Sequence, residues 1–365
     1  MKQVIYKIGW RAASVAAGLL VAGLLAEAFG RGAPALYSVL WSGAFGSWGR
    51  LLATLSKVAP LLLAGLAVAV PLSAGLFNIG GDGQLYAGAL LSVSVALFCA
   101  GLPRALLLPL VLVAGVLGGA AWASVAGWLR ARRGVHEVIA TIMLNFVAFH
   151  ATAWLVNRGP LADPSGVART PQIGAAARLP VLAESGTYNL SAALLVALGA
   201  ALAAWWLVSR TVTGFRFRAV GGNAPAASRK GVSLARTRFL AMAAGGAFGG
   251  LAGALELAGV QYSLSAAFSP GYGFDGIAVA LVAAGNALAV PFAALLFAAV
   301  RAAGPGLQLD AGLSQETIYV IEAVVVIAAA VPSMPPILRR VAARLRERGG
   351  GRRGGRTQAR VEAPR

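Results

Sequence analysis

The chain has 365 residues, of which 58% are apolar and only 12% are Asp, Glu, Lys or Arg. A water-soluble globular protein carries about a quarter charged residues, so this composition excludes an ordinary soluble domain. The net charge of +19 would suit a nucleic-acid-binding protein, but the basic residues fall between apolar blocks, which is typical of membrane topology. One cysteine and two histidines exclude an internal disulfide and a credible zinc or haem site.

The apolar blocks predict an all-α polytopic membrane protein with about ten transmembrane helices, some of them short or broken. The first block resembles a signal peptide, but the many later spans favour a signal anchor. We expect a transmembrane domain at 1–336 and an Arg/Gly-rich, disordered cytoplasmic tail at 337–365. The predicted spans are 12–28, 51–70, 84–101, 105–128, 137–156, 189–208, 239–259, 276–285, 288–303 and 316–331.

The distribution of Lys and Arg predicts that both termini are cytoplasmic. With the N-terminus inside, most of the 31 basic residues fall in segments that face the cytoplasm, as the positive-inside rule requires. The loop at 157–188 then faces outward, and the segment at 71–83 becomes a cytoplasmic loop. The basic cytoplasmic segments are 1–11, 129–136, 209–238 and 332–365.

A polar, glycine-rich segment at 77–84 interrupts the apolar pattern and contains Asn78, Asp82 and Gln84. Irregular backbone at membrane depth persists only where protein or a water-filled cavity covers it. Asp82 would begin a helix, where the positive helix end favours a carboxylate. The alternative is an ordinary cytoplasmic turn that Asp82 caps, and the sequence supports both interpretations equally.

The segment 134–145 begins a membrane helix with a line of polar residues. Glu137, Thr141 and Asn145 follow one another at intervals of four, so they share one helix face. Polar groups inside a span usually face the bundle interior or a pathway, and we expect this of Asn145. Glu137 is better explained as a helix cap that pairs with Arg132 or Arg133.

The loop at 209–238 has the pattern of a short docking helix. Asn223 is a good N-cap, Pro225 suits the first turn, and Gly231 suits the end of the helix. Ala226 and Ala227 would make this helix slim enough to enter a groove on a partner. The alternative is a solvated basic loop, which would not need this pattern.

The segment 271–281 is again glycine-rich, with Asp275 near the start of a small-residue helix. In the predicted topology this segment faces outward, whereas Asp82 faces inward. Two broken, acid-headed helices on opposite faces indicate an inverted repeat around a central pathway. Glu256 and Glu322 also lie near or within spans, but each could equally be paired or interfacial.

Together these four segments resemble the permease subunits of bacterial ABC importers for nucleosides and simple sugars, relatives of the ribose and branched-chain amino acid permeases. The segment 77–84 matches a family pattern with Asp82 in place of the usual Glu. The segment 134–145 matches another, with His136 in place of Asn. The segments 218–231 and 273–281 match in order and spacing.

The resemblance implies an importer of two permeases and two ATPases in the bacterial inner membrane, fed by an extracytoplasmic substrate-binding lipoprotein. It implies a nucleoside substrate, with a simple sugar as the alternative, and a second permease that is a paralogue. The chain has no phosphate-binding loop, so we expect no enzyme activity and no cofactor, with ATP hydrolysed by a partner.

The resemblance and the broken-helix pattern also give the candidate site residues. We expect no catalytic or metal-binding residue. For the substrate pathway we expect Asn78, Asp82, Gln84, Asn145 and Asp275. For coupling to the ATPase, through the 218–231 loop and its flanks, we expect Gly214, Arg218, Ala219, Gly221, Asn223, Ala226, Ala227 and Gly231.

Two other functions are considered. A proton-coupled secondary transporter is suggested by Asp82, Glu137, Asp275 and Glu322, but proton relays usually need more buried charge than this chain has. An intramembrane enzyme finds no support, because the chain offers no Ser-His or metal pair and His136 and His150 are 14 residues apart.

Overall fold

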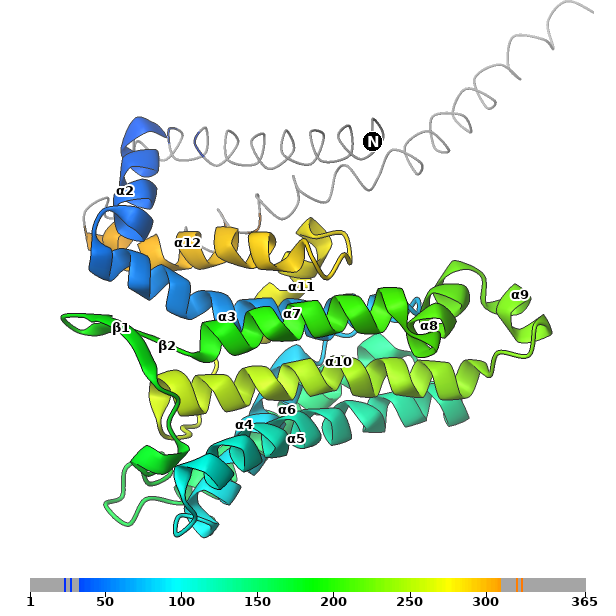
Figure 1. The fold of residues 1–365 in the computed structure, drawn as a ribbon, viewed down its shortest axis with the longest axis horizontal. Coiled ribbons are helices and arrows are strands. Elements are labelled where there is room, and N and C mark those ends of the chain that lie inside the picture. Colours follow the sequence, from blue (N-terminus) through cyan, green and yellow to red (C-terminus); the bar gives the residue numbers. More distant parts are fainter. Residues whose placement is uncertain (1–22, 24–26, 28–32, 310–319, 321–322, 324–365) are drawn as a thin grey trace, which may run out of the picture.

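The computed structural model describes residues 33–309 and the isolated residues 23, 27, 320 and 323 (Figure 1). The predicted spans at 12–28 and 316–331, Glu322 and the predicted tail at 337–365 lie outside this part of the chain. The boundary at residue 336 and the total of ten spans therefore stay predictions.

The regular secondary structure of the described part is helical apart from one small hairpin. Each of the eight spans predicted within it contains a helix, and α2 is an additional helix that the sequence analysis missed. The helices are α2 (Ala33–Phe45), α3 (Trp48–Leu72), α4 (Gly81–Phe98), α5 (Arg104–Arg133), α6 (Glu137–Asn157), α7 (Ala193–Arg210), α8 (Val212–Gly222), α9 (Ala224–Arg229), α10 (Leu234–Glu256), α11 (Tyr272–Val282) and α12 (Val290–Leu309).

Five of the described helical segments are long and apolar enough to cross a membrane, which confirms a polytopic all-α membrane fold. Shorter apolar helices, including α11, accompany them. A π-helical turn at Leu257–Gln261 extends α10. The strands β1 (Val181–Ser185) and β2 (Tyr188–Ser191) form an antiparallel hairpin, so α7 begins four residues after the predicted start at 189.

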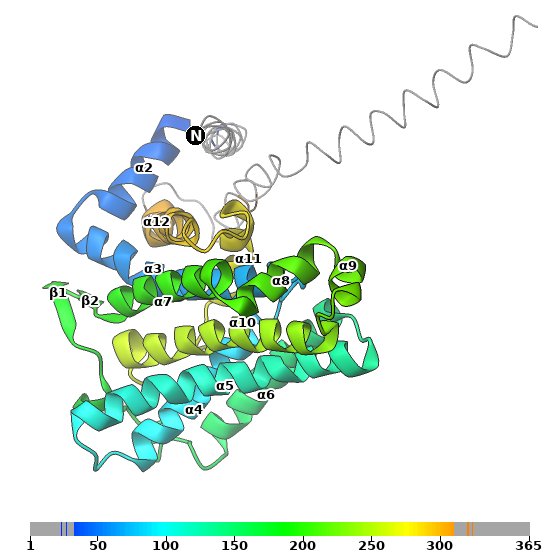
Figure 2. The same cartoon turned by 45° about the vertical axis from the view of Figure 1, so that its right-hand side comes forward.

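Helix α3 is the central element of the fold, with almost every residue from Val58 to Pro71 buried. Figure 2 shows α7 and α10 beside it, α4, α5 and α6 beyond α10, and α11 and α12 on the other side. A membrane helix buried on all sides needs slim neighbours, because lipid provides no hydrophobic drive for association.

Glycines bring α10 into backbone contact with α4 and α5. A Cβ added at Gly250 would lie 2.7 Å from the Cα of Gly119, and one added at Gly88 would strike the backbone of Gly250. The high glycine content therefore serves close helix packing in this layer.

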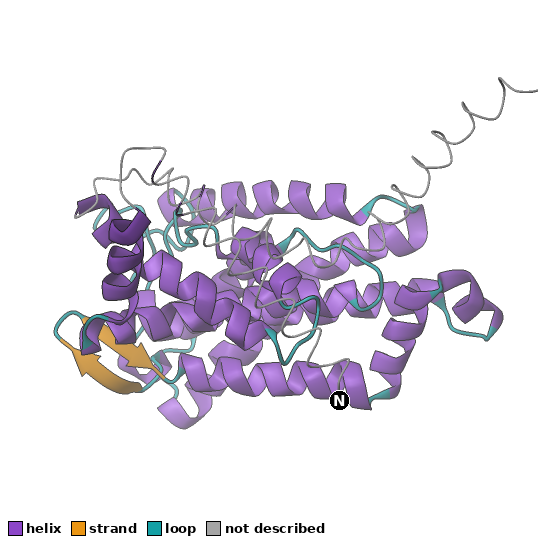
Figure 3. Ribbon diagram, turned by 90° about the horizontal axis from the view of Figure 1, so that it is seen from above, coloured by secondary structure: helices purple, strands orange, loops and turns teal. Residues whose placement is uncertain are grey.

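The two ends of the bundle differ. The last turn of α5 and the pair α8–α9 lie at one end, on the right of Figure 1, and the β1–β2 hairpin lies at the other. Figure 3 shows the same separation from above, with the orange strands at the end opposite the projecting helical arm. The predicted cytoplasmic segments 129–136 and 209–238 thus meet at one end, which agrees with the predicted topology.

Candidate functional site

The first candidate site is the junction at which the broken helices α4 and α11 meet. The segment from Asn78 to the start of α4 is buried, which confirms an interruption covered by protein rather than an ordinary turn. The amides of Asn78 and Gln84 pair reciprocally, at 3.0 and 2.9 Å, and Asn78 also donates to the carbonyl oxygen of Ala67 at 2.9 Å. These bonds fasten the segment to α3.

Helix α6 holds the same segment from the other side. The Asn145 side chain accepts a hydrogen bond from the Gly83 amide at 2.8 Å and donates to the Ile79 carbonyl at 2.9 Å. The Thr141 hydroxyl accepts one from the Ile79 amide at 3.3 Å. The expectation that Asn145 faces the interior is therefore confirmed.

The start of α6 differs in part from expectation. His136 is the N-cap, and its Nδ1 accepts from the Val138 amide at 3.4 Å, so this departure from the family pattern keeps a capping side chain. Glu137 pairs with Arg130, at 3.1 Å, and not with Arg132 or Arg133. The reason is geometric, because Gly134 ends α5 in a left-handed conformation and the chain folds back beside the preceding turn.

Asp82 links the two broken helices directly. Its Oδ1 accepts hydrogen bonds from the Ser269 hydroxyl at 2.7 Å and from the Gly273 amide at 3.0 Å, at the first turn of α11. A Cβ added at Gly81 would lie 3.0 Å from the Cα of Gly273, so the two helix starts touch. The expectation that these acid-headed helices lie on opposite faces is wrong, because both begin at one buried point.

Asp275 lies at the edge of this junction. Its carboxylate is 2.7 Å from a guanidinium nitrogen of Arg301, on α12, and the two side chains are only 18% and 13% exposed. Arg301 also donates to the carbonyl oxygen of Pro270 at 2.6 Å and lies 5.1 Å above the Tyr272 ring. The sequence analysis missed Arg301, although a lone arginine inside an apolar run is a signal for such a role.

Another buried carboxylate, Glu256, lies at the end of α10 that is close to the β1–β2 hairpin. Glu256 accepts a hydrogen bond at 2.9 Å from Gln261, whose amide also donates to the carbonyl oxygen of Phe268. Lys57 of α3 and Arg301 place positive charge close to it. Glu256 thus belongs to the interior, and the sequence left this open.

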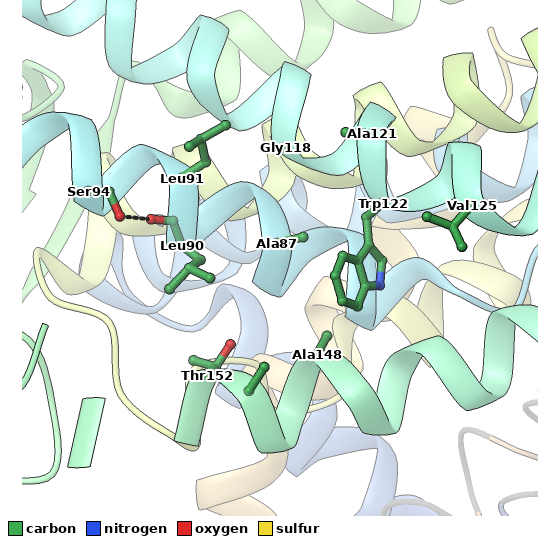
Figure 4. A pocket seen from close by; sticks show the side chains of 11 residues that line it. Ala87, Leu90, Leu91, Ser94, Gly118, Ala121, Trp122, Val125, Ala148 and Thr152 are labelled. Atoms are coloured by element: carbon green, nitrogen blue, oxygen red, sulfur yellow. Dashed lines mark hydrogen bonds between the residues drawn. The ribbon is translucent and has the colours of Figure 1, made fainter. Parts of the chain in front are cut away.

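An apolar cavity of about 460 Å³ lies between α4, α5 and α6 (Figure 4). The hydroxyl of Ser94, one of its few polar groups, already donates to the Leu90 carbonyl at 2.8 Å. A site for a hydroxyl-rich solute needs several convergent polar groups, so this cavity suits an acyl chain better. Its lining is Ala87, Leu90, Leu91, Ser94, Gly118, Ala121, Trp122, Val125, Ala148, Ala151 and Thr152.

The second candidate site is the α8–α9 arm. Asn223 caps α9 by accepting from the Ala226 amide at 3.0 Å, and Gly231 is left-handed with φ +82°, so the predicted short helix is confirmed. Ala226 is exposed, but Ala227 is only 7% exposed and faces the arm's interior. Ala227 is therefore packed within the described chain, and its predicted role in coupling stays a prediction.

Glycines fix the position of the arm on the bundle. A Cβ added at Gly214 would clash with the carbonyl oxygens of Leu207 and Val208. A Cβ at Gly221 would likewise strike the carbonyl oxygen of Ser73, just beyond the end of α3. Arg218 is exposed and Ala219 half-buried. The arm thus rests on the segment that leads to Asn78.

Comparison with known proteins decides the family. Residues 50–330 match the family described as the branched-chain amino acid transport system permease component. The chain belongs to this family. It is a permease subunit rather than an enzyme, and the family implies an ATPase and a substrate-binding partner.

Three relatives cover most of the chain. The glucose ABC transporter permease protein TsgB13 of Haloferax volcanii is 37% identical, over 86% of this chain and 84% of its own length. The guanosine ABC transporter permease protein NupP of Bacillus subtilis is 35% identical, over 85% and 89%. The nucleoside ABC transporter permease protein NupB of Lactococcus lactis is 34% identical, over 85% and 86%.

Proposed function

We propose that this chain is a permease subunit of an ATP-driven importer of nucleosides. The observation that carries the proposal is its similarity to guanosine and nucleoside permeases over about 85% of its length. The similarity to a glucose permease supports a simple sugar as the second candidate. The ribose of a nucleoside and a hexose present similar hydroxyl groups, so one pathway chemistry serves either substrate.

The α8–α9 arm is the proposed contact with the ATPase. Its outer surface carries Arg216, Arg218, Arg229 and Lys230, all exposed. Its inner surface contacts Ser73, and the chain leads from Ser73 directly to the buried segment that includes Asn78. A movement of the arm, driven by ATP bound to the partner, would reach the α4–α11 junction through this contact. The permease itself needs no cofactor in this scheme.

The substrate pathway is proposed to open at this junction. Asn78, Asp82, Gln84 and Asn145 are each at most 1% exposed and bonded within the chain, so the structure represents a closed state of this region. Alternating access requires that such bonds be exchanged between two conformations. These four residues and Asp275 are proposed to line the pathway when the two helix starts separate.

The second permease is proposed to be a paralogue. Two guanosine permease proteins of Bacillus subtilis, NupP and NupQ, both resemble this chain, as do NupB and NupC of Lactococcus lactis. Such pairs support a heterodimer. We further propose that a substrate-binding lipoprotein delivers the nucleoside to the hairpin end and that both termini lie in the bacterial cytoplasm.

The test is uptake of radiolabelled guanosine by cells that lack other nucleoside importers and express this chain with its ATPase, second permease and binding protein. Uptake should require the chain and disappear when the phosphate-loop lysine of the ATPase is replaced. Unlabelled adenosine should compete, and glucose should not. Competition by glucose alone would favour the sugar importer. Uptake that continues with the inactive ATPase but stops when the proton gradient is dissipated would favour a secondary transporter.

A further inference from the structure

His150 is a polar side chain where a lipid-facing one is expected. It lies on the outer face of α6, opposite Thr141 and Asn145, and it is exposed. We compared the exposed side chains that lie more than one turn from a helix end in the described helices α3 to α7 and α10 to α12. All of them except His150 are apolar. Leu117 of α5 and Leu202 of α7, which are 58% and 60% exposed, represent this lipid-facing pattern.

The depth of His150 makes lipid contact unfavourable. It lies seven positions before the end of α6 at Asn157, which is about 10 Å at 1.5 Å per residue. An imidazole is too short to reach the interface over that distance, as a lysine or arginine can. Ionisable groups within membrane spans almost always face a water-filled cavity or the protein interior.

Aromatic side chains lie one turn before and one turn after His150 on this face. Phe146, His150 and Trp154 follow one another at intervals of four, and Met143 precedes them on the same face. Phe146, Trp154 and Met143 are 52%, 60% and 53% exposed. We call these four residues the α6 stripe.

The α6 stripe is joined to the α4–α11 junction by ring contacts. The Phe146 ring is 6.3 Å from that of Phe149, which lies 5.0 Å from the Tyr86 ring. The Tyr86 hydroxyl accepts a hydrogen bond at 3.0 Å from the Ser269 amide, beside the Asp82 contact. The stripe is therefore connected to the place where the two broken helices meet through Phe149 and Tyr86, although it lies on the other face of α6.

We propose that the α6 stripe lines the substrate pathway and binds the flat base of the nucleoside. Aromatic rings stack on any nucleobase, because every base presents a π-face. A neutral imidazole offers one donor and one acceptor to the polar edge of a base. The binding of a base rests on the proposed nucleoside function. The other part of the proposal, that the stripe faces a water-filled pathway, does not.

Thiol labelling tests the contact with water, because Cys99 is the only cysteine of the chain. In a Cys99→Ala background of the complete importer, His150→Cys should react with a charged, membrane-impermeant thiol reagent at least about tenfold faster than Leu117→Cys or Leu202→Cys. Guanosine should slow that reaction during ATP-driven turnover. A rate equal to that of the two leucine positions would overturn the pathway assignment, and a fast rate without protection would overturn the substrate contact.

A matched pair of tryptophans tests the base contact. Trp154 on the stripe and Trp206 on α7 are 60% and 59% exposed, so truncation removes similar exposed surface. Trp154→Ala should raise the KM for guanosine uptake by about tenfold or more, as expected for a lost stacking contact, and Trp206→Ala should leave it unchanged. Equal KM values for both variants would overturn the base assignment. If wild-type uptake of guanosine were absent while the His150→Cys variant still reacted, the nucleoside function would fail and the pathway would stand.

Discussion

At the scale of single residues, the junction depends on side-chain amides that replace missing backbone partners. The interruption before α4 leaves backbone groups without helical partners, and a buried group without a hydrogen bond costs free energy. Asn145 satisfies two of them, the Gly83 amide and the Ile79 carbonyl. Its role in the closed state is therefore structural, whatever it contacts when the pathway opens.

We predict that Asn145→Ala destabilises the purified permease by about 1–3 kcal/mol, because it leaves two buried backbone groups unpaired. The measurement is the thermal unfolding midpoint in detergent. Asn157→Ala is the matched control, since Asn157 is exposed at the last turn of the same helix. An equal decrease in both variants would show that Asn145 does not brace the loop.

The sequence indicates which polar residues face inward but not what they contact. The four-residue spacing of Thr141 and Asn145 is local information, and both are buried as expected. The bond between Asp82 and Gly273 joins residues 191 positions apart, and no local pattern encodes such a pair. The Asp275–Arg301 ion pair was missed for the same reason, because its partner lies on another helix.

At the scale of elements, the α8–α9 arm was predictable because its determinants are local. An Asn cap, a proline in the first turn and a terminal glycine define a short helix wherever it lies. The inward orientation of Ala227 depends on how the arm rests on the bundle, which the sequence does not specify. Helix α2 was missed because its 13 residues are fewer than the roughly 20 that cross a bilayer.

Two neighbouring glycines in α8 test whether the contact between the α8–α9 arm and Ser73 is needed for coupling. We predict that Gly221→Val uncouples ATP hydrolysis from guanosine uptake, because its side chain would strike the Ser73 carbonyl and displace the arm. Gly222→Val is the control, since a Cβ at Gly222 meets nothing within 4 Å. Both place the same residue near the end of α8, so helix propensity changes equally.

The measurement compares ATPase activity and uptake in proteoliposomes that contain the complete importer. Gly221→Val should reduce uptake per ATP hydrolysed by about tenfold, within the range of typical allosteric couplings, while Gly222→Val stays near wild type. Normal coupling in Gly221→Val would show that the contact with Ser73 does not transmit the movement of the arm.

At the scale of the whole molecule, hydropathy located the described spans but not their arrangement. Each span is a local run of apolar residues, whereas packing depends on which small residues face one another, such as Gly119 and Gly250. The meeting of α4 and α11 corrects the expected placement of the repeats, because both helices start inside the protein. An inverted repeat in which the broken helices converge is the arrangement typical of transport sites.

The orientation of the bundle gives the last prediction. Basic residues gather at the end that carries α8 and α9, whereas the hairpin segment 181–191 contains no Lys or Arg, so the arm should be cytoplasmic. In a Cys99→Ala background, an impermeant thiol reagent applied to spheroplasts should label Thr187→Cys in the hairpin turn and not Ser228→Cys in α9, and both positions are exposed. Inside-out vesicles should reverse the pattern. Labelling of Ser228→Cys from outside would place the arm on the face where no ATPase could reach it, and would refute the proposed coupling role.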